Sequence, residues 1–312
     1  MESNPFGLPL RSLADAKEFG GRFAEAANCS RNDMTCLRSR SLTELEVAFN
    51  MTSLEVTDPS LITMVFQPWS PVIDGLVVPA QPILTFMQGQ EQKKPMLLGA
   101  TVDEGMIFVA EAFPNPMDGA SYKALLLAVF KPMHYNKVLE QYPECTEPGC
   151  DNRENLNHLA TEYLFTCPQR KALNSTALDR WWYILNQTWS FYEVWEQPQC
   201  FYRVCHAAEL AYLFNVEPLT TFEYTEEEKV LSERFAWYWT NFAKRAHPNG
   251  KTSKYELTSE NVQETQWPQF NNNGGANYQA LQIRAAGDFV MDRPYEEICR
   301  FWDELDAYAE HY

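Results

Sequence analysis

Pro95-Met-Leu-Leu-Gly-Ala-Thr-Val-Asp-Glu-Gly-Met-Ile-Phe108 is an apolar run that ends in two adjacent acids and a glycine. This pattern indicates a buried strand followed by a tight turn. Asp103 or Glu104 then lies at the carboxyl end of a strand, the edge where open α/β sheets hold their chemistry. The stretch therefore predicts an α/β fold with a candidate acid at one rim of the sheet.

A histidine that can pair with this acid lies further along, in Phe201-Tyr-Arg-Val-Cys-His-Ala-Ala-Glu-Leu-Ala-Tyr-Leu-Phe-Asn215. His206 follows a run of bulky, strand-forming residues at 181–186. A lone histidine is usually structural, and adjacent acids usually mark a solvated turn. Together, an acid and then a histidine make two parts of a hydrolase triad in chain order. The nucleophile should precede both, yet Gly-x-Ser-x-Gly occurs nowhere in the 312 residues.

Periodicity and capping residues predict the remaining elements. A helix is expected over 12–27, with Ser12 as its cap. After the loop between Cys29 and Cys36, a second, short helix ends near Phe49. Further helices are expected over 121–130, 133–142, 155–165, 224–246 and 293–308. The helix over 224–246 has a capping box, Thr225 with Glu228. A strand is expected over 278–283, and the segments 77–86 and 96–100 form either a strand pair or a strand and a short helix.

Seven stretches of the chain, in order, resemble those of the type-B carboxylesterase family, which includes the cholinesterases. They are Glu2-Ser-Asn-Pro-Phe, Cys29 with Cys36-Leu-Arg, Pro71-Val-Ile-Asp-Gly, Leu97-Leu-Gly-Ala-Thr-Val-Asp-Glu-Gly, Cys205-His-Ala-Ala-Glu, Trp239-Thr-Asn-Phe-Ala and Trp267-Pro-Gln-Phe. The resemblance implies the C-terminal part of an α/β-hydrolase sheet with flanking and cap helices. The leading strands and the nucleophile elbow would lie upstream of Met1, so residues 1–312 are expected to form one incomplete domain.

The resemblance also implies roles for individual residues. Glu104 would be the triad acid, His206 the base, and Glu209 a second buried acid that supports the histidine loop. The reaction would be carboxylic ester hydrolysis through an acyl-enzyme, with the serine and the oxyanion-hole glycines supplied from outside the chain. We expect these residues alone to be inactive and to need no cofactor. The alternative is a non-catalytic, cholinesterase-like binding or adhesion module.

A substrate pocket is expected next to these residues. In the family, residues just before Pro-Val-Ile-Asp-Gly line the acyl pocket, which makes Val65, Gln67 and Trp69 candidates; packing beneath a loop explains them equally well. Ile107 stands where cholinesterase-like enzymes have an aromatic residue that faces a quaternary ammonium. This difference favours a general carboxylic ester as the substrate, although Phe108 can compensate.

Eight cysteines, an even number, indicate disulfides rather than a metal site, because no second cysteine pair with nearby histidines completes a zinc site. The resemblance pairs Cys29 with Cys36 and Cys167 with Cys299. Proximity pairs the other four, as Cys145–Cys150 and Cys200–Cys205.

Four Asn-x-Ser/Thr sequons agree with passage through a secretory compartment, at Asn28, Asn50, Asn174 and Asn186. The first residues do not resemble a signal peptide. We therefore expect a secreted or lumenal protein whose signal lies upstream.

The net charge of −17 disfavours nucleic acid and anionic membranes as partners. No apolar run approaches the roughly 18 residues of a membrane span. The expected partner is a small-molecule ester. A homodimer through the C-terminal helix is possible in this family, although packing within one chain explains the aromatic residues of that helix as well.

Overall fold

A four-stranded sheet forms the centre of the protein. The computed structural model describes residues 1–53, 67–130, 132–250, 265–270, 278–305 and 308. The strands of the sheet, in spatial order, are β3 (Met96–Thr101), β4 (Arg180–Leu185), β5 (Gln279–Ile283) and β6 (Phe289–Asp292). The first three are parallel and β6 is antiparallel to β5. The predicted α/β architecture is confirmed, with the predicted strands at their expected places.

Strand β6 was not predicted. It is four residues long, lies at the edge of the sheet and is largely exposed. A short edge strand of this kind has no buried face, so its sequence lacks the alternation of apolar and polar residues that identifies a half-buried strand.

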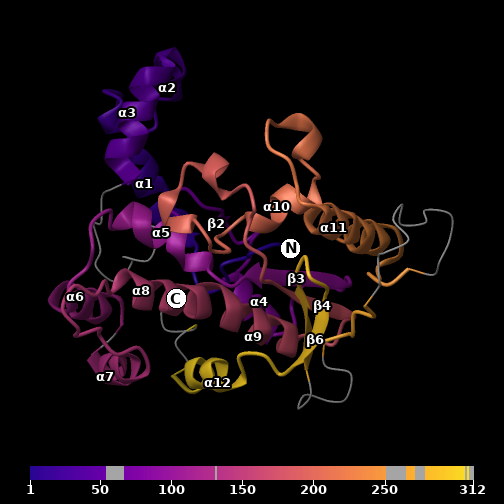
Figure 1. Cartoon of the computed structure of the whole chain (residues 1–312). Helices are drawn as coiled ribbons and strands as arrows, with labels where there is room; N and C mark the ends of the chain where they lie inside the picture. The colour runs from indigo at the N-terminus through magenta and orange to yellow at the C-terminus, as the bar shows by residue number, and fades with distance from the viewer. Residues whose placement is uncertain (54–66, 131, 251–264, 271–277, 306–307, 309–312) are drawn as a thin grey trace.

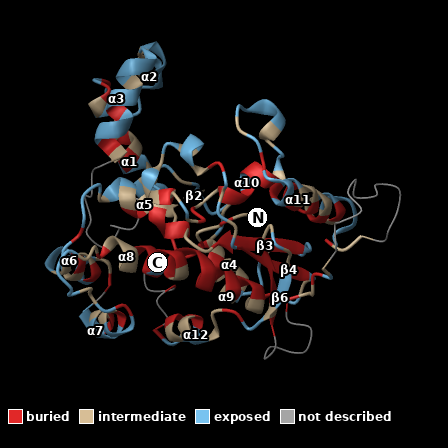
Figure 2. Ribbon diagram, viewed as in Figure 1, coloured by how far each residue is buried: buried red, intermediate tan, exposed pale blue. Residues whose placement is uncertain are grey.

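Alternate residues of β4 enter two separate core layers. Trp182 and Ile184 pack into one layer, and Trp181, Tyr183 and Leu185 into the other. The first layer is covered by α9 (Cys167–Ser175) and α12 (Glu296–Leu305), the second by α10 (Ala208–Leu213) and α11 (Glu226–Arg245). Figures 1 and 2 show this buried sheet between its two sets of helices. A central strand buried on both faces explains the continuous run of bulky residues at this position.

One helix is longer than expected. The prediction over 155–165 corresponds to α8 (Arg153–Ala160), which continues through a π-helical turn, η2 (Thr161–Thr166), directly into α9. Pro168 interrupts the helical pattern because it has no N–H to give to the carbonyl of Leu164. The wide turn resolves the conflict, since Leu164 O accepts from Gly7 N at 3.0 Å instead.

Four further helices lie close to their predicted places: α1 (Leu13–Ala26), α3 (Leu42–Ser53), α6 (Gly119–Val129) and α7 (Pro132–Gln141). Helix α4 spans Pro82–Met87. The sequence did not predict helices α2 (Met34–Ser39), α5 (Glu104–Ala112), α9 and α10, or the 3-10 turns η3 (Tyr192–Trp195), η4 (Pro198–Cys200) and η5 (Glu217–Leu219). The Ser12 hydroxyl caps α1 by accepting from Asp15 N. The short α4 decides the alternative at 77–86 in favour of a helix.

Helices α1, α2 and α3 form an arm that projects from the body (Figure 1). The base of the arm is joined to the body by a two-stranded parallel ladder of β1 (Arg11–Ser12) and β2 (Val72–Ile73). Several apolar side chains of the arm are exposed, among them Leu42 at 73% and Met51 at 57%.

All eight cysteines are paired as predicted: Cys29–Cys36, Cys145–Cys150, Cys167–Cys299 and Cys200–Cys205. The long-range bridge joins α9 to α12, whose Cys299, Trp302 and Leu305 are buried within the same chain. Pairing of two subunits through α12 stays a prediction. Within the described part of the chain, no helix combines the length and the apolar character needed to cross a bilayer.

The predicted capping box at the start of α11 is confirmed, and Glu228 does more than cap the helix. Its carboxylate accepts from Thr225 N at 2.9 Å, Ser190 N at 2.9 Å, Ser190 Oγ at 2.5 Å and Tyr212 OH at 2.9 Å. Glu228 is 1% exposed, so these donors have little access to water. One acid therefore ties α11 to α10 and to the loop that follows β4.

We expect Glu228→Ala to lower the free energy of unfolding by about 3 kcal/mol, because buried donors would lose their acceptor. Urea denaturation measures this change. Glu226→Ala, in the same turn but with a side chain that is 87% exposed, is the control and should change it by less than about 0.5 kcal/mol. Equal effects of the two substitutions would contradict this account of Glu228.

Candidate active site

Glu104 lies in the first turn of α5, directly beyond the carboxyl end of β3. Its side chain is completely buried. Oε1 accepts from Thr101 N at 2.6 Å and from Ser3 Oγ at 2.5 Å. The next residue must be small, because a Cβ on Gly105 would lie 2.6 Å from Asn157 O of α8. This close packing of α5 on α8 fixes the carboxylate at the rim of the sheet.

His206 meets this carboxylate. Its Nδ1 lies 2.5 Å from Glu104 Oε2, which is the contact expected of a histidine oriented by an acid. Burial by itself lowers the pKa of His206, but the hydrogen bond and the negative charge of Glu104 outweigh burial and leave that pKa raised. With Nδ1 engaged, Nε2 is the nitrogen that remains to exchange a proton with a substrate or nucleophile.

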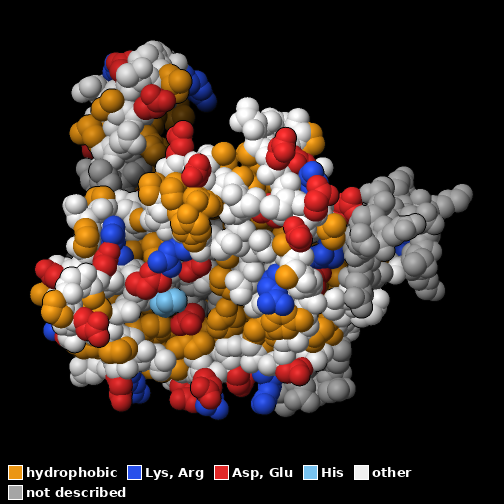
Figure 3. Space-filling model, in the orientation of Figure 1, with side chains coloured by type: hydrophobic (Ala, Val, Ile, Leu, Met, Phe, Trp, Pro, Cys, Tyr) orange, Lys and Arg blue, Asp and Glu red, His pale blue; other side chains and the backbone are white. Residues whose placement is uncertain are grey.

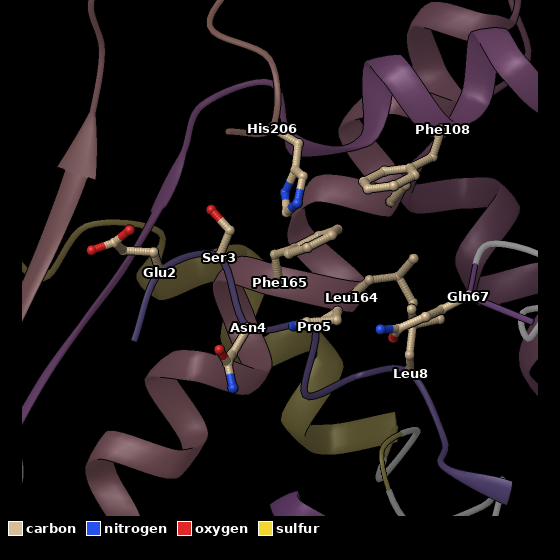
Figure 4. Close-up of a pocket in the computed structure, with 11 residues that line it drawn as sticks. Glu2, Ser3, Asn4, Pro5, Leu8, Gln67, Phe108, Leu164, Phe165 and His206 are labelled. Carbon is tan, nitrogen blue, oxygen red and sulfur yellow. The ribbon is translucent and has the colours of Figure 1, made fainter. Parts of the chain in front are cut away.

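The imidazole borders a cavity of about 290 Å³. Its ring centroid lies 5.0 Å from that of Phe108 and 5.6 Å from that of Phe165. Figure 4 shows the histidine ring pointing toward Ser3 and Phe165, with Phe108 beside it. The cavity is lined by Glu2, Ser3, Asn4, Pro5, Leu8, Gln67, Phe108, Ala160, Leu164, Phe165 and His206.

Of the five candidate pocket residues, two line the cavity. Gln67 and Phe108 line the cavity, whereas Trp69 and Ile107 are not among its lining residues. Trp69 packs among aromatic rings of α1 and α3, and its Nε1 donates to Ser53 Oγ at 3.0 Å. Ile107 packs on the Cys200–Cys205 disulfide. Val65 lies outside the described residues.

Ser3, Leu164 and Phe165 also line the cavity, although the sequence did not predict them as site residues. Ser3 reaches Glu104 across 101 positions of sequence, and no local pattern signals such a contact. Leu164 and Phe165 belong to the π-helical turn, whose width places them on the cavity. Pro168, two residues after the end of this turn, is the signal in the sequence that could have indicated it.

Clusters of three or more histidine, cysteine or acidic side chains that could hold a metal are absent from the described part of the chain. On the face shown in Figure 3, acidic and basic side chains are interspersed around hydrophobic ones.

The carboxylesterase family model matches residues 8–302. This chain belongs to the carboxylesterase family. It is 34% identical over 260 residues to the crystal protein of Dictyostelium discoideum and 27% identical over 268 residues to acetylcholinesterase 1 of Caenorhabditis elegans. These matches include 80% and 75% of the chain but only 46% and 41% of those proteins. The chain thus spans less than half the length of these relatives.

Solved structures show the same fold. A thermophilic PNB esterase superposes with a TM-score of 0.68 at 21% identity, over 96% of this chain and 56% of that one. The α/β-hydrolase sheet predicted for this chain is thereby confirmed.

Glu209 is a second acid close to the pair. It is 1% exposed, and its Oε2 is buried without a hydrogen-bond partner among the described residues. Burial and the nearby charge of Glu104 raise the pKa of Glu209 from 4.5 to about 8, and Glu2 adds to this effect. The charge of His206 opposes it. At neutral pH the folded protein therefore holds a proton on Glu209.

This raised pKa makes stability depend on pH. A carboxyl whose folded-state pKa is above its unfolded value binds the proton more tightly when folded, so stability falls as pH rises from about 4.5 to about 8. Glu209→Gln cannot ionise. We expect the variant to gain about 3 kcal/mol relative to the parent between pH 5 and pH 8 in urea unfolding. Glu193→Gln, at an exposed position, is the control. Its unfolding free energy should differ from that of the parent by the same amount at every pH. If the Glu209→Gln variant also differed from the parent by a constant amount, the carboxyl of Glu209 would ionise normally.

Ala207 has a backbone φ of 72°, in the left-handed region that favours glycine. We expect Ala207→Gly to stabilise the fold by about 0.5–1 kcal/mol, since relief of strain exceeds the added freedom of the unfolded chain. Ala110→Gly, inside α5, should destabilise by about 1 kcal/mol. Thermal unfolding compares the two; destabilisation by both would show that Ala207 is unstrained.

Proposed function

We propose that Glu104 and His206 are the acid and the base of a serine carboxylic ester hydrolase. The observation that supports the proposal most is the 2.5 Å contact between a fully buried carboxylate and Nδ1 of a histidine that borders a cavity. A buried carboxylate paired with a partly exposed imidazole has a catalytic geometry, because it fixes the ring and leaves Nε2 accessible. The serine belongs to a part of the family domain that these residues do not span.

In the proposed reaction, Nε2 of His206 takes the serine proton as the serine oxygen attacks the ester carbonyl carbon. The tetrahedral intermediate collapses when the protonated ring gives this proton to the leaving alcohol. In the second half of the reaction, water attacks the acyl-enzyme in the same way, His206 takes the water proton and returns it to the serine oxygen, and the carboxylic acid is released. Glu104 keeps the proton on Nδ1 and stabilises the imidazolium. The donors of the oxyanion hole, like the serine, come from outside the chain.

The substrate we propose is an uncharged carboxylic ester. Six of the eleven side chains that line the cavity are apolar, and the rings of Phe108 and Phe165 adjoin the imidazole. Burial of an apolar acyl or alcohol group against these rings would supply binding energy. Ile107, at the place of the cholinesterase aromatic, is directed to the disulfide and offers no face to a cation.

A second candidate is a non-catalytic binding module of the same family. The observation that favours it is the similarity of the chain to neuroligin-2 of Rattus norvegicus, to which it is 28% identical over 281 residues. Retention of both Glu104 and His206 favours the hydrolase.

We further propose that the protein passes through a secretory compartment. Its four disulfides are typical of oxidising compartments. Asn28, Asn50 and Asn186 are exposed and suited to carry glycans. Asn174 is less accessible, since its Oδ1 is buried.

The test is to express the chain in continuity with the polypeptide encoded upstream of Met1 and to treat it with a fluorophosphonate serine probe. We expect labelling and ester turnover in the extended protein and neither in residues 1–312 alone. His206→Ala should lower kcat of the extended protein by about 10⁴-fold or more. His158→Ala, at a side chain that is 56% exposed, is the control and should leave kcat unchanged.

Each outcome discriminates between the candidates. Turnover that survives His206→Ala would exclude this histidine as the base. An upstream elbow with glycine or aspartate in place of serine, and no labelling, would favour the binding module.

A further inference from the structure

The loop that carries His206 is closed covalently just before the histidine. Cys200 and Cys205, five positions apart, form a disulfide, and both residues are buried. The disulfide packs against Met106 and Ile107, on the same helix, α5, whose first turn carries Glu104. The covalent ring thus rests on the element that holds the acid.

Asp103 fastens the same loop by its backbone and its side chain. Asp103 N donates to Val204 O at 3.1 Å, and Val204 N donates back to Asp103 Oδ2 at 3.2 Å. Asp103 and Cys205 form an isolated parallel bridge. Glu104 directly follows Asp103, and His206 directly follows Cys205. The parallel bridge therefore places Glu104 and His206 side by side.

Two further contacts hold Asp103 itself. Asn157 Nδ2, fully buried on α8, donates to Asp103 Oδ1 at 3.1 Å. Arg203 Nη1 lies 3.7 Å from Asp103 Oδ1, and Arg203 Nη2 lies 2.7 Å from Glu154 Oε2 of α8. The loop is therefore fixed to both α5 and α8.

The backbone directly after the histidine is strained, with Ala207 at φ 72°. A residue stays in such a conformation only where its surroundings over-determine it. The disulfide ring and the Asp103 contacts supply that constraint on the side that precedes His206.

We infer that the Cys200–Cys205 ring and Asp103 are positioning elements for His206, which set its ring on Glu104 without touching the reacting atoms. The inference rests on the proposed function in one respect: the contact between His206 and Glu104 serves catalysis only if the protein is a hydrolase. A shift of about 1 Å in such a group can cost about 100-fold in rate, so a loop of this length gains from being closed and clamped. Asp103 acts through the loop, whereas its neighbour Glu104 acts on the ring.

The experiment uses residues 1–312 and needs no nucleophile. Proton NMR follows two signals of His206: the far-downfield Nδ1–H resonance of the hydrogen bond to Glu104, assigned by its loss in His206→Ala, and the pKa of the ring. In the Cys200→Ala/Cys205→Ala variant and in Asp103→Asn we expect the resonance to broaden or vanish and the pKa to fall by about one unit.

Two variants serve as matched controls. Cys145→Ala/Cys150→Ala removes a disulfide of the same five-position separation. Asp151→Asn removes a carboxylate that also accepts a backbone N–H, from Met117 at 2.9 Å, and also pairs with an arginine. Both should leave the resonance and the pKa of His206 unchanged. Circular dichroism establishes that each variant is folded.

Unchanged His206 signals in the folded cysteine variant and in Asp103→Asn would overturn the inference. If the cysteine variant does not fold, Asp103→Asn decides alone. A parent chain without the downfield resonance would also overturn it. Failure of the proposed function looks different, because the resonance would then respond as expected while the extended protein shows no serine labelling.

Discussion

A carboxylate with no access to water has to be satisfied by donors from the protein, and in this chain that requirement falls on Glu104. Its donors come from three distant segments: Ser3 near the N-terminus, Thr101 at the end of β3, and His206 on the loop after β4. Loss of any one of them leaves a buried charge without part of its solvation. The acid therefore joins the beginning, the centre and the second half of the described chain at one point.

The surrounding fold shows why that point is well defined. Gly105 allows α5 to pack closely on α8, and Asp103 links α5 to the histidine loop. The π-helical turn accommodates Pro168 and leaves Leu164 O as an acceptor for Gly7 N, which holds the N-terminal segment along the cavity. The last of these contacts uses the carbonyl of Leu164, which a regular helix would have left unpaired before Pro168.

The electrostatics around the histidine are asymmetric. Glu104, surrounded by donors, supports a positive charge on His206, while Glu209 has an unpartnered oxygen and a raised pKa and holds a proton near neutral pH. Burial and the nearby charge of Glu104 are the causes of the raised pKa of Glu209. The two buried acids near the histidine thus differ in their hydrogen bonds, since Glu104 accepts several and Glu209 Oε2 accepts none among the described residues.

The sequence alone determined the strand before Glu104, the strand at 181–186, the caps of α1 and α11, the cysteine pairs and the family, because each depends on local pattern or on motifs in order. It could not determine β6, whose exposed edge carries no alternation, or the continuation of α8 through η2, which depends on a donor from Gly7. The meeting of Glu104 with His206 was expected from chain order and resemblance. Only the tertiary structure decided that Ser3 and Phe165 belong to the same site, that Trp69 and Ile107 pack elsewhere, and that Asp103 clamps the loop. These facts depend on contacts between segments far apart in the chain, and such contacts leave no periodic trace in the sequence.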